Sequence, residues 1–181
     1  MGVKEVKRMS NPGPDAAQSR NQAFEQLVNQ YQTALLRMCC LYLRDKTLAE
    51  DAVQETFIKA WRSMQSFRGD SSEKTWLMKI AINTCRDINR SGWLRFMERR
   101  FTPEELPEPA APMEENEEEL VKAIMHLPVR LREVILLYYY QGMNTQEAAE
   151  SLGIAQSSVS GRLKRAREKL RKYLEERDQD G

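Results

Sequence analysis

Apolar side chains recur at intervals of three and four residues along most of the chain, which is the spacing of one face of an α-helix. In the first half of the chain this pattern predicts helices over residues 22–43, 49–64 and 73–90. The residues expected to face inward from them are Phe24, Leu27, Val28, Tyr31, Leu35, Met38, Ala52, Val53, Phe57, Ala60, Trp61, Trp76, Leu77, Ile80, Ala81, Thr84 and Ile88. No stretch alternates with period two over a useful length, so the expected fold class is all-α.

The second half contains a pattern typical of a helix-turn-helix over residues 144–172. Asn144 is placed to cap a first short helix, and Glu147, three residues on, can bond back to the capping residue. Gly153 is expected to end that helix, because glycine adopts a positive φ without strain. A second helix follows, with one apolar stripe formed by Val159, Leu163, Ala166, Leu170 and Leu174.

The second helix of this pair is strongly basic. Residues 155–172 contain seven Lys and Arg residues and a single acidic residue, Glu168. A face of one charge sign is typical of a surface that follows nucleic-acid phosphates, whereas solvated faces usually mix both signs. An amphipathic helical hairpin with merely solvated charges is the alternative.

The charge distribution divides the chain into segments. Residues 1–20 contain Pro and Gly and are expected to form a disordered tail, and residues 21–101 are mildly basic. Residues 102–119 contain eight glutamates, four prolines and no basic residue, which predicts an extended acidic linker. Residues 120–181 are mildly basic again, with helices expected over 120–125 and 129–140 before the helix-turn-helix. The predicted architecture is therefore two small helical domains on a flexible tether.

Composition excludes several kinds of site. The three cysteines lack a Cys-x-x-Cys spacing, and Cys39 and Cys40 are adjacent, so they are expected to be buried thiols of a reducing cytoplasm. With His126 as the sole histidine, they form no recognisable zinc site, and no cofactor-binding motif is present. No apolar run approaches the length of a membrane span, so we expect a cytoplasmic protein without membrane insertion of its own.

Two of the predicted helices also carry polar faces. Asp51, Gln54 and Glu55 lie at i, i+3 and i+4 and therefore share one side of a helix. Residues 74–90 expose basic and amide side chains opposite their apolar side. From the residues alone, solvation is the usual explanation of both polar faces, accompanied on residues 74–90 by i,i+3 or i,i+4 pairing such as Asp87 with Arg90.

Three stretches together resemble a known family: AEDAVQETFIKAW (49–61), KTWLMKIAINTCRDINR (74–90) and the segment from 127 to 170 that contains the helix-turn-helix. Their order resembles that of bacterial RNA polymerase sigma factors of the extracytoplasmic-function type, over residues 22–174. The resemblance implies a non-enzymatic subunit without cofactor or catalytic residues, which binds core polymerase and directs initiation at promoters through their −10 and −35 elements. It also implies an anti-sigma factor as a further partner.

The resemblance assigns roles to particular residues. Asp51, Gln54 and Glu55 would contact the clamp helices of the largest polymerase subunit. The −10 element would be read and melted by the domain at 21–101, through Phe67, Arg68, Lys79, Asn83, Arg86, Asp87 and Arg90. The −35 element would be read by the domain at 120–181, through Thr145, Ser157, Ser158, Ser160, Arg162 and Arg165. Phe57, Trp61 and Trp76 are expected to be structural.

The chain departs from the family within the basic helix. Where relatives commonly show Gly-Thr-Val-Lys-Ser-Arg, this chain has Ser157-Ser158-Val159-Ser160-Gly161-Arg162, so a lysine is lost and a glycine lies inside a helix. This affects the −35 sequence that could be recognised.

A different function also fits the pattern of the second half. A self-sufficient repressor or activator would join a helical sensing domain to a helix-turn-helix, and it would bind palindromic duplexes as a dimer. An enzyme is disfavoured, because no nucleophile, phosphate-binding loop or metal-ligand set is recognisable.

Overall fold

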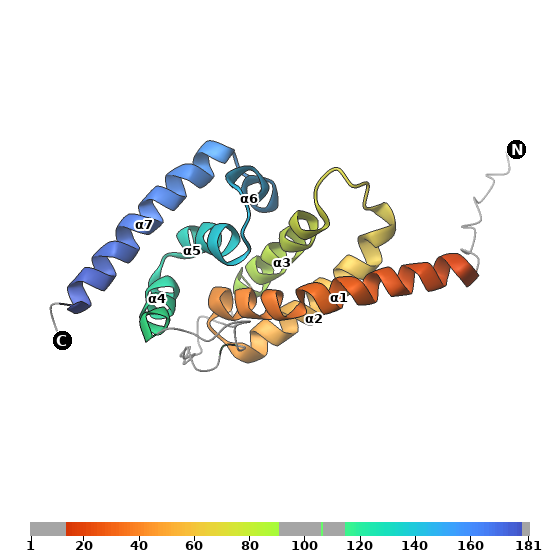
Figure 1. Cartoon of the computed structure of the whole chain (residues 1–181), viewed down its shortest axis with the longest axis horizontal. Coiled ribbons are helices and arrows are strands. Elements are labelled where there is room, and N and C mark those ends of the chain that lie inside the picture. The colour runs from red at the N-terminus through yellow and green to blue at the C-terminus, as the bar shows by residue number, and fades with distance from the viewer. Residues whose placement is uncertain (1–13, 91–105, 107–114, 179–181) are drawn as a thin grey trace, which may run out of the picture. The chain divides into compact units, whose positions relative to one another are not determined.

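The computed structural model describes residues 14–90, 106 and 115–178, with side chains described from 18 to 90, at 106 and from 118 to 176. Within these residues every regular element is helical, which confirms the all-α prediction (Figure 1). The chain divides into two units, Met1–Tyr31 and Gln32–Gly181. The first contributes the beginning of helix α1, and the tertiary contacts described below lie within the second.

Three helices of the first half form one hydrophobic core. They are α1 (Pro14–Leu43), α2 (Lys46–Ser63) and α3 (Glu73–Arg90), with a short 3₁₀ turn, η1 (Met64–Ser66), after α2. Leu35, Leu41, Ala52, Leu77 and Ile82 are completely buried. The bounds of α3 are as predicted, but Trp76, Ile80 and Ile88 are only half-buried, and Met78, Ile82 and Cys85 take the inner positions.

Local chemistry explains where these helices begin and end. Arg44 adopts a left-handed conformation with φ 56°, and its N–H donates to the carbonyl of Cys40 at 2.8 Å, which ends α1. Asp45 then accepts a hydrogen bond from the backbone N–H of Leu48 at 2.9 Å and caps α2. Asp45 is therefore the N-cap of α2.

Two helices begin inside segments that were expected to be unstructured. α1 starts at Pro14, within the predicted tail, where the fixed φ of proline suits the first position of a helix. Helix α4 (Glu115–His126) starts within the predicted linker, because glutamate is a good helix former and acidic residues are favourable in a first turn. The remainder of the tail and linker, except Leu106, lies outside the described residues. The division into two domains at the linker stays a prediction.

The second half comprises α4, α5 (Val129–Ile135), a π-helical continuation η4 (Leu136–Tyr140), α6 (Thr145–Leu152) and α7 (Gln156–Asp178). In η4 the N–H of Gln141 donates to the carbonyl of Leu136 at 3.0 Å, which is an i→i+5 bond. The prediction of a single α-helix over 129–140 thus holds only up to Ile135.

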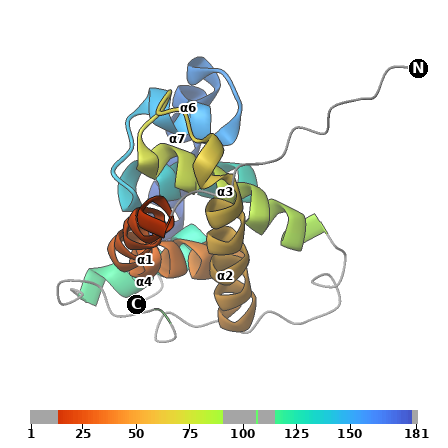
Figure 2. The ribbon, with the colours of Figure 1, turned by 90° about the vertical axis from the view of Figure 1, so that its right-hand side faces the viewer.

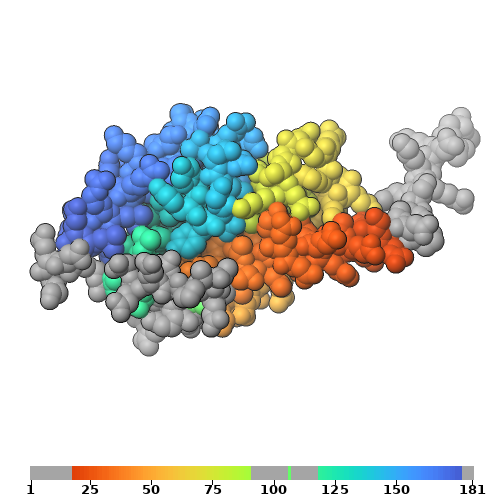
Figure 3. Space-filling model, viewed as in Figure 1, coloured from red at the N-terminus to blue at the C-terminus, as the bar shows by residue number. Residues whose placement is uncertain are grey.

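Helices from the two halves pack against each other within the second unit. α6 lies next to α3 in both ribbon views (Figures 1 and 2), and the surfaces of α3 and α6 adjoin in the space-filling view (Figure 3). Ser151 donates to the carbonyl of Thr75 at 3.4 Å, and the Arg132 guanidinium donates to the carbonyl of Tyr42 at 2.7 Å. The buried Ser151 hydroxyl and the buried Arg132 guanidinium therefore find hydrogen-bond partners across this contact.

Candidate nucleic-acid and protein interfaces

The helix-turn-helix is built as the sequence predicts. Asn144 accepts hydrogen bonds from the N–H groups of Gln146 and Glu147 at 2.9 and 3.0 Å, and the Glu147 carboxylate accepts from the Asn144 N–H at 2.8 Å. This reciprocal capping box fixes the start of α6. Gly153 ends the helix with φ 66° and ψ 40°. Ala148 and Leu152 are buried against the inner side of α7 at Val159.

The start of α7 presents the small polar side chains predicted to read DNA. Ser157, Ser158 and Ser160 are all exposed, and the Ser160 hydroxyl donates to the carbonyl of Gln156 at 3.3 Å. The Thr145 hydroxyl accepts from the Gln156 side-chain amide at 2.7 Å. Since Thr145 begins α6 and Gln156 begins α7, this bond brings the N-termini of the two helices together, where free N–H groups favour anions.

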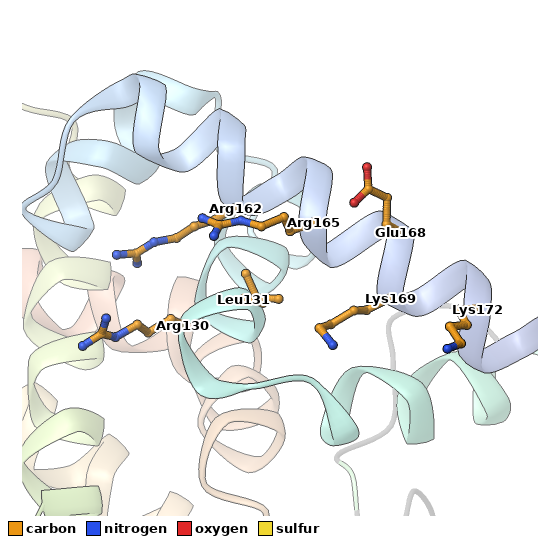
Figure 4. Close-up of a pocket in the computed structure, with 7 residues that line it drawn as sticks. All are labelled: Arg130, Leu131, Arg162, Arg165, Glu168, Lys169 and Lys172. Carbon is orange, nitrogen blue, oxygen red and sulfur yellow. The ribbon is translucent and has the colours of Figure 1, made fainter.

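Cationic side chains along α7 line a concave surface of about 530 Å³ between α7 and α5. Its lining is Arg130, Leu131, Arg162, Arg165, Glu168, Lys169 and Lys172. Figure 4 shows Lys169 and Lys172 on the side of α7 that faces α5, whereas Glu168 points the opposite way. The predicted −35 residues Arg162 and Arg165 belong to this basic groove. Arg130 was not predicted, because it comes from a helix whose sequence pattern is mainly apolar.

The residues predicted to contact the −10 element lie on α3 and on the loop before it. Lys79, Asn83, Asp87 and Arg90 are exposed, and Arg90 donates to Asp87 at 2.5 Å, which is the i,i+3 pairing anticipated from the sequence. Exposed donors and acceptors on one helix can form hydrogen bonds with base edges or phosphates.

The loop after α2 and the first turn of α3 together place an aromatic pair beside an arginine. The rings of Phe67 and Trp76 lie 4.9 Å apart with an interplanar angle of 33°. With Ser66, Arg68, Asp70 and Ser71 they line a hollow of about 300 Å³. Aromatic faces of this kind stack well on unpaired bases. Trp76 was expected to be structural only, but the structure places its half-buried ring at this hollow.

Arg86, also predicted to contact DNA, is engaged within the protein instead. Its Nε and Nη2 donate to the two carboxylate oxygens of Glu133 at 2.8 and 3.0 Å, and its Nη1 donates to the carbonyl of Leu152 at 3.3 Å. The hydrogen bond to Glu133 raises the pKa of Arg86, although burial opposes the shift. Arg162, from the basic groove, lies 3.8 Å from the same carboxylate.

Glu133 also affects Tyr42, whose hydroxyl donates to it at 2.9 Å. Burial raises the pKa of Tyr42 well above its usual range, and the neighbouring Glu133 charge adds to this effect. Glu133 was not predicted as a functional residue. Its only signal in the sequence is that it is the one acidic residue in the apolar stretch 129–140.

The polar face of α2 is displayed as expected. Asp51 and Gln54 are exposed, whereas Glu55 is partly covered and pairs with Lys59 at 3.6 Å. A shallow groove of about 260 Å³ runs beside this face and is lined by Gln32, Thr33, Leu36, Glu50, Val53 and Gln54. Acidic and amide groups around a small apolar floor are typical of protein interfaces with a polar rim. The predicted core residues Phe57 and Trp61 are only half-buried.

The described residues show no group of His, Cys, Asp and Glu that could hold a metal ion. All three cysteines are buried as predicted, and none forms a disulfide. The Sγ atoms of Cys85 and Cys39 lie 3.6 Å apart, and the hydrogen bond between these thiols, together with burial, raises the pKa of Cys39.

Among the helices described, none is long and apolar enough to cross a membrane.

Comparison with known families identifies the two halves. The model for sigma-70 region 2 matches residues 27–95, and a model for sigma-70 region 4 matches residues 117–170.

Curated relatives match over most of their length. The chain is 33% identical to the RNA polymerase sigma-H factor of Pseudomonas aeruginosa, over 84% of this chain and 86% of that protein. It is also 33% identical to the RNA polymerase sigma factor CnrH of Cupriavidus metallidurans, over 88% and 91% of the two chains. The extracytoplasmic-function (ECF) sigma factor SigX of Bacillus subtilis is 30% identical, over 85% and 84%.

Two solved structures show the same fold. CnrH in complex with the cytosolic domain of CnrY has a TM-score of 0.66 and 33% identity, over 88% of this chain and 94% of that one. The sigma factor RpoE of Bartonella quintana in complex with the anti-sigma factor NepR has a TM-score of 0.73 and 26% identity, over 85% and 98%.

Proposed function

The chain belongs to the sigma-70 family and is an RNA polymerase sigma factor of the extracytoplasmic-function type; from this premise we propose how its surfaces divide the work of initiation. Residues 21–101 bind core polymerase and read and melt the −10 element, and residues 120–181 read the −35 element. The acidic segment 102–119 connects the two readers.

One observation carries the proposal for the −35 element. A capped helix-turn-helix presents exposed serines at the N-terminus of its second helix and a row of cations along the same helix. Short polar side chains at that N-terminus suit the major groove, and the cations suit the flanking phosphates. Ser157, Ser158, Ser160 and Arg165 are the base-proximal candidates. Thr145 and Arg162 flank them.

For the −10 element, the supporting observation is the position of the aromatic hollow next to α3. Phe67 and Trp76 offer a stacking surface, and Arg68 supplies a cation at the rim. A base taken out of the duplex would be held here and identified by its edges. The exposed side chains of α3 (Lys79, Asn83, Asp87 and Arg90, with Arg86 once it is released) would contact the adjacent strand.

The α2 face is the proposed contact with core polymerase. Asp51, Gln54 and Glu55 would dock on the clamp helices of the largest subunit, and the apolar floor beside Gln54 would add buried area. The protein would act in the cytoplasm, without a cofactor and without catalysing a reaction itself. An anti-sigma factor is a proposed further partner, since both solved relatives described above were captured with a partner protein.

Run-off transcription tests this assignment. Purified chain is added to core polymerase with a promoter library, and transcripts are compared for the natural chain and an Asp51→Ala/Glu55→Ala variant. The matched control is Glu25→Ala/Glu175→Ala, which removes two exposed carboxylates, one on α1 and one near the end of α7. We expect the α2 variant to lose transcription and the control to retain it. Full activity of the α2 variant, or tight promoter binding by the chain without polymerase, would contradict the proposal.

A further inference from the structure

One buried carboxylate neutralises arginines from both proposed DNA readers. Glu133 lies on α5 and its side chain is only 3% exposed. It accepts two hydrogen bonds from Arg86 of α3 and one from Tyr42 of α1, and it lies 3.8 Å from Arg162 of α7. A carboxylate this deeply buried needs compensating charge and hydrogen bonds, and here these come from residues that the −10 and −35 elements would otherwise engage.

The geometry leaves Arg86 unable to bind DNA at the same time. The pairing with Glu133 is bidentate, which is the strongest arrangement for a guanidinium and a carboxylate, and the remaining nitrogen is bonded to the carbonyl of Leu152. Every nitrogen of Arg86 therefore has a partner within the protein. A phosphate or a base edge could bind this side chain only after its bonds to Glu133 are broken.

Arg162 is held less completely. Its side chain is 18% exposed, and its Nη1 lies 3.8 Å from Glu133 but forms no hydrogen bond. A buried donor without an acceptor is unfavourable, so Arg162 would gain a bond by turning toward a phosphate. Arg86 gains nothing comparable. The two arginines would thus be released in different steps.

We propose that Glu133 acts as an ionic lock that withholds Arg86 and Arg162 from DNA in the free sigma factor, and that the lock opens when core polymerase separates the α3 and α5 surfaces. The inference rests on the proposed function for the identity of the DNA-reading residues. Glu133 is a positioning residue: it touches no DNA and acts through the two arginines.

The residue next to Glu133 fixes the surrounding main chain by hydrogen bonds. Arg132, 4% exposed, donates to the carbonyls of Tyr42, Met125 and Leu127 at 2.7 to 2.8 Å. It thereby ties the end of α1 to the α4–α5 connection through the main chain of Tyr42, the residue whose hydroxyl donates to Glu133. Arg132 therefore holds the main chain of Tyr42 in the position from which the Tyr42 hydroxyl donates to Glu133. The contacts of Glu133 are thus part of a fixed arrangement and not an isolated ion pair.

The first test measures binding of the chain alone to a labelled random-sequence duplex, by fluorescence anisotropy over a range of salt concentrations. Glu133→Gln keeps the shape of the side chain but removes its charge. The control, Glu150→Gln, makes the same change of net charge at an exposed position of α6, where the carboxylate accepts a hydrogen bond from the Gln146 side chain.

The lock predicts a steeper salt dependence for Glu133→Gln, because each released arginine that binds a phosphate adds about 0.9 to the slope of log K against log salt. We expect an increase of about 0.9 to 1.8 over the natural chain, together with an affinity about tenfold higher, whereas Glu150→Gln should keep the natural slope. Equal slopes for Glu133→Gln and Glu150→Gln, with both variants folded by circular dichroism, would overturn the proposal.

A second test uses the natural chain and therefore does not depend on the variant folding. Arginine modification by a dicarbonyl reagent is mapped by mass spectrometry, with and without core polymerase. Arg90, one turn further along α3 and with a side chain 76% exposed, serves as the internal reference for Arg86, which is 28% exposed.

We expect Arg86 to be protected relative to Arg90 in the free chain and to become reactive in the holoenzyme. Equal reactivity of the two in the free chain would refute the lock. Failure of the chain to bind polymerase would instead refute the proposed function, and the protection of Arg86 and the salt slope would still report on the lock.

Discussion

Gly161 and Gly153 are eight residues apart in the helix-turn-helix, and the same substitution is predicted to change stability in opposite directions at the two sites. Gly161 lies inside α7 without a positive φ, and a methyl group added there would meet no atom within 4 Å. Gly153 has equally open surroundings, but its φ is +66°. Steric room for a methyl group is therefore the same at both sites. Backbone conformation alone decides whether the substitution raises or lowers the free energy of unfolding.

The magnitudes follow from helix energetics. Gly161→Ala should stabilise the fold by about 1 kcal/mol, because alanine loses less conformational entropy than glycine in a helix. Gly153→Ala should destabilise it by about 1–2 kcal/mol, since the left-handed conformation brings Cβ close to the following carbonyl oxygen. For a chain of this size 1 kcal/mol corresponds to a change in Tm of about 2–4 °C.

Thermal and urea unfolding followed by circular dichroism measure both variants against the natural chain. The urea midpoint should rise for Gly161→Ala and fall for Gly153→Ala, at an unchanged m-value. Both substitutions leave every charge of the basic groove in place, so electrostatic changes do not complicate the comparison. A shift of the same sign for the two variants would refute the reasoning from backbone conformation.

Three further predictions concern the cap, the buried tyrosine and the thiols. Asn144→Ala should destabilise the fold by about 1 kcal/mol in urea unfolding, since two N–H groups at the start of α6 lose their acceptor, and Asn144→Asp should restore most of the loss. Because the folded-state pKa of Tyr42 is raised, the stability linked to its neutral hydroxyl is complete below pH 10 and declines above it by at most about 1.4 kcal/mol per pH unit. Tyr42→Phe should therefore flatten the fall of the urea midpoint between pH 10 and 11, and an unchanged pH profile would count against the burial argument. The three cysteines should react with a thiol reagent at pH 8 only after denaturation, because all are buried and the pKa of Cys39 is raised; rapid labelling of the native chain would show that the core opens readily.

Local signals in the sequence predicted the helices and their caps well. The capping box at Asn144, the stop at Gly153 and the bounds of α3 each depend on residues within a few positions of one another. Patterns of this range can be recognised without knowledge of the tertiary structure. The starts of α1 and α4 were placed too late, because proline and glutamate were taken as signs of disorder although both are favourable in a first helical turn.

The candidate site was predictable only in part. The basic face of α7 and the acidic face of α2 follow from helical spacing, and the structure displays both. The pairing of Arg86 with Glu133 joins residues 47 positions apart, and no periodicity within a helix contains such a contact. For the same reason the sequence could not predict that Arg86, assigned to a DNA contact, is held against α5 in the folded chain.

The π-helical segment η4 has a consequence for how this chain should be compared with its relatives. An i→i+5 turn accommodates one residue more than an α-helical turn while the flanking helix keeps its direction. Leu136–Tyr140 is thus a place where a single-residue insertion can be absorbed without disturbing the buried residues before it or the capping box after it. Homologues with an uninterrupted α-helix here should align with a gap of one position, and removing one residue from this segment should be tolerated better than the same deletion in α3 or α7.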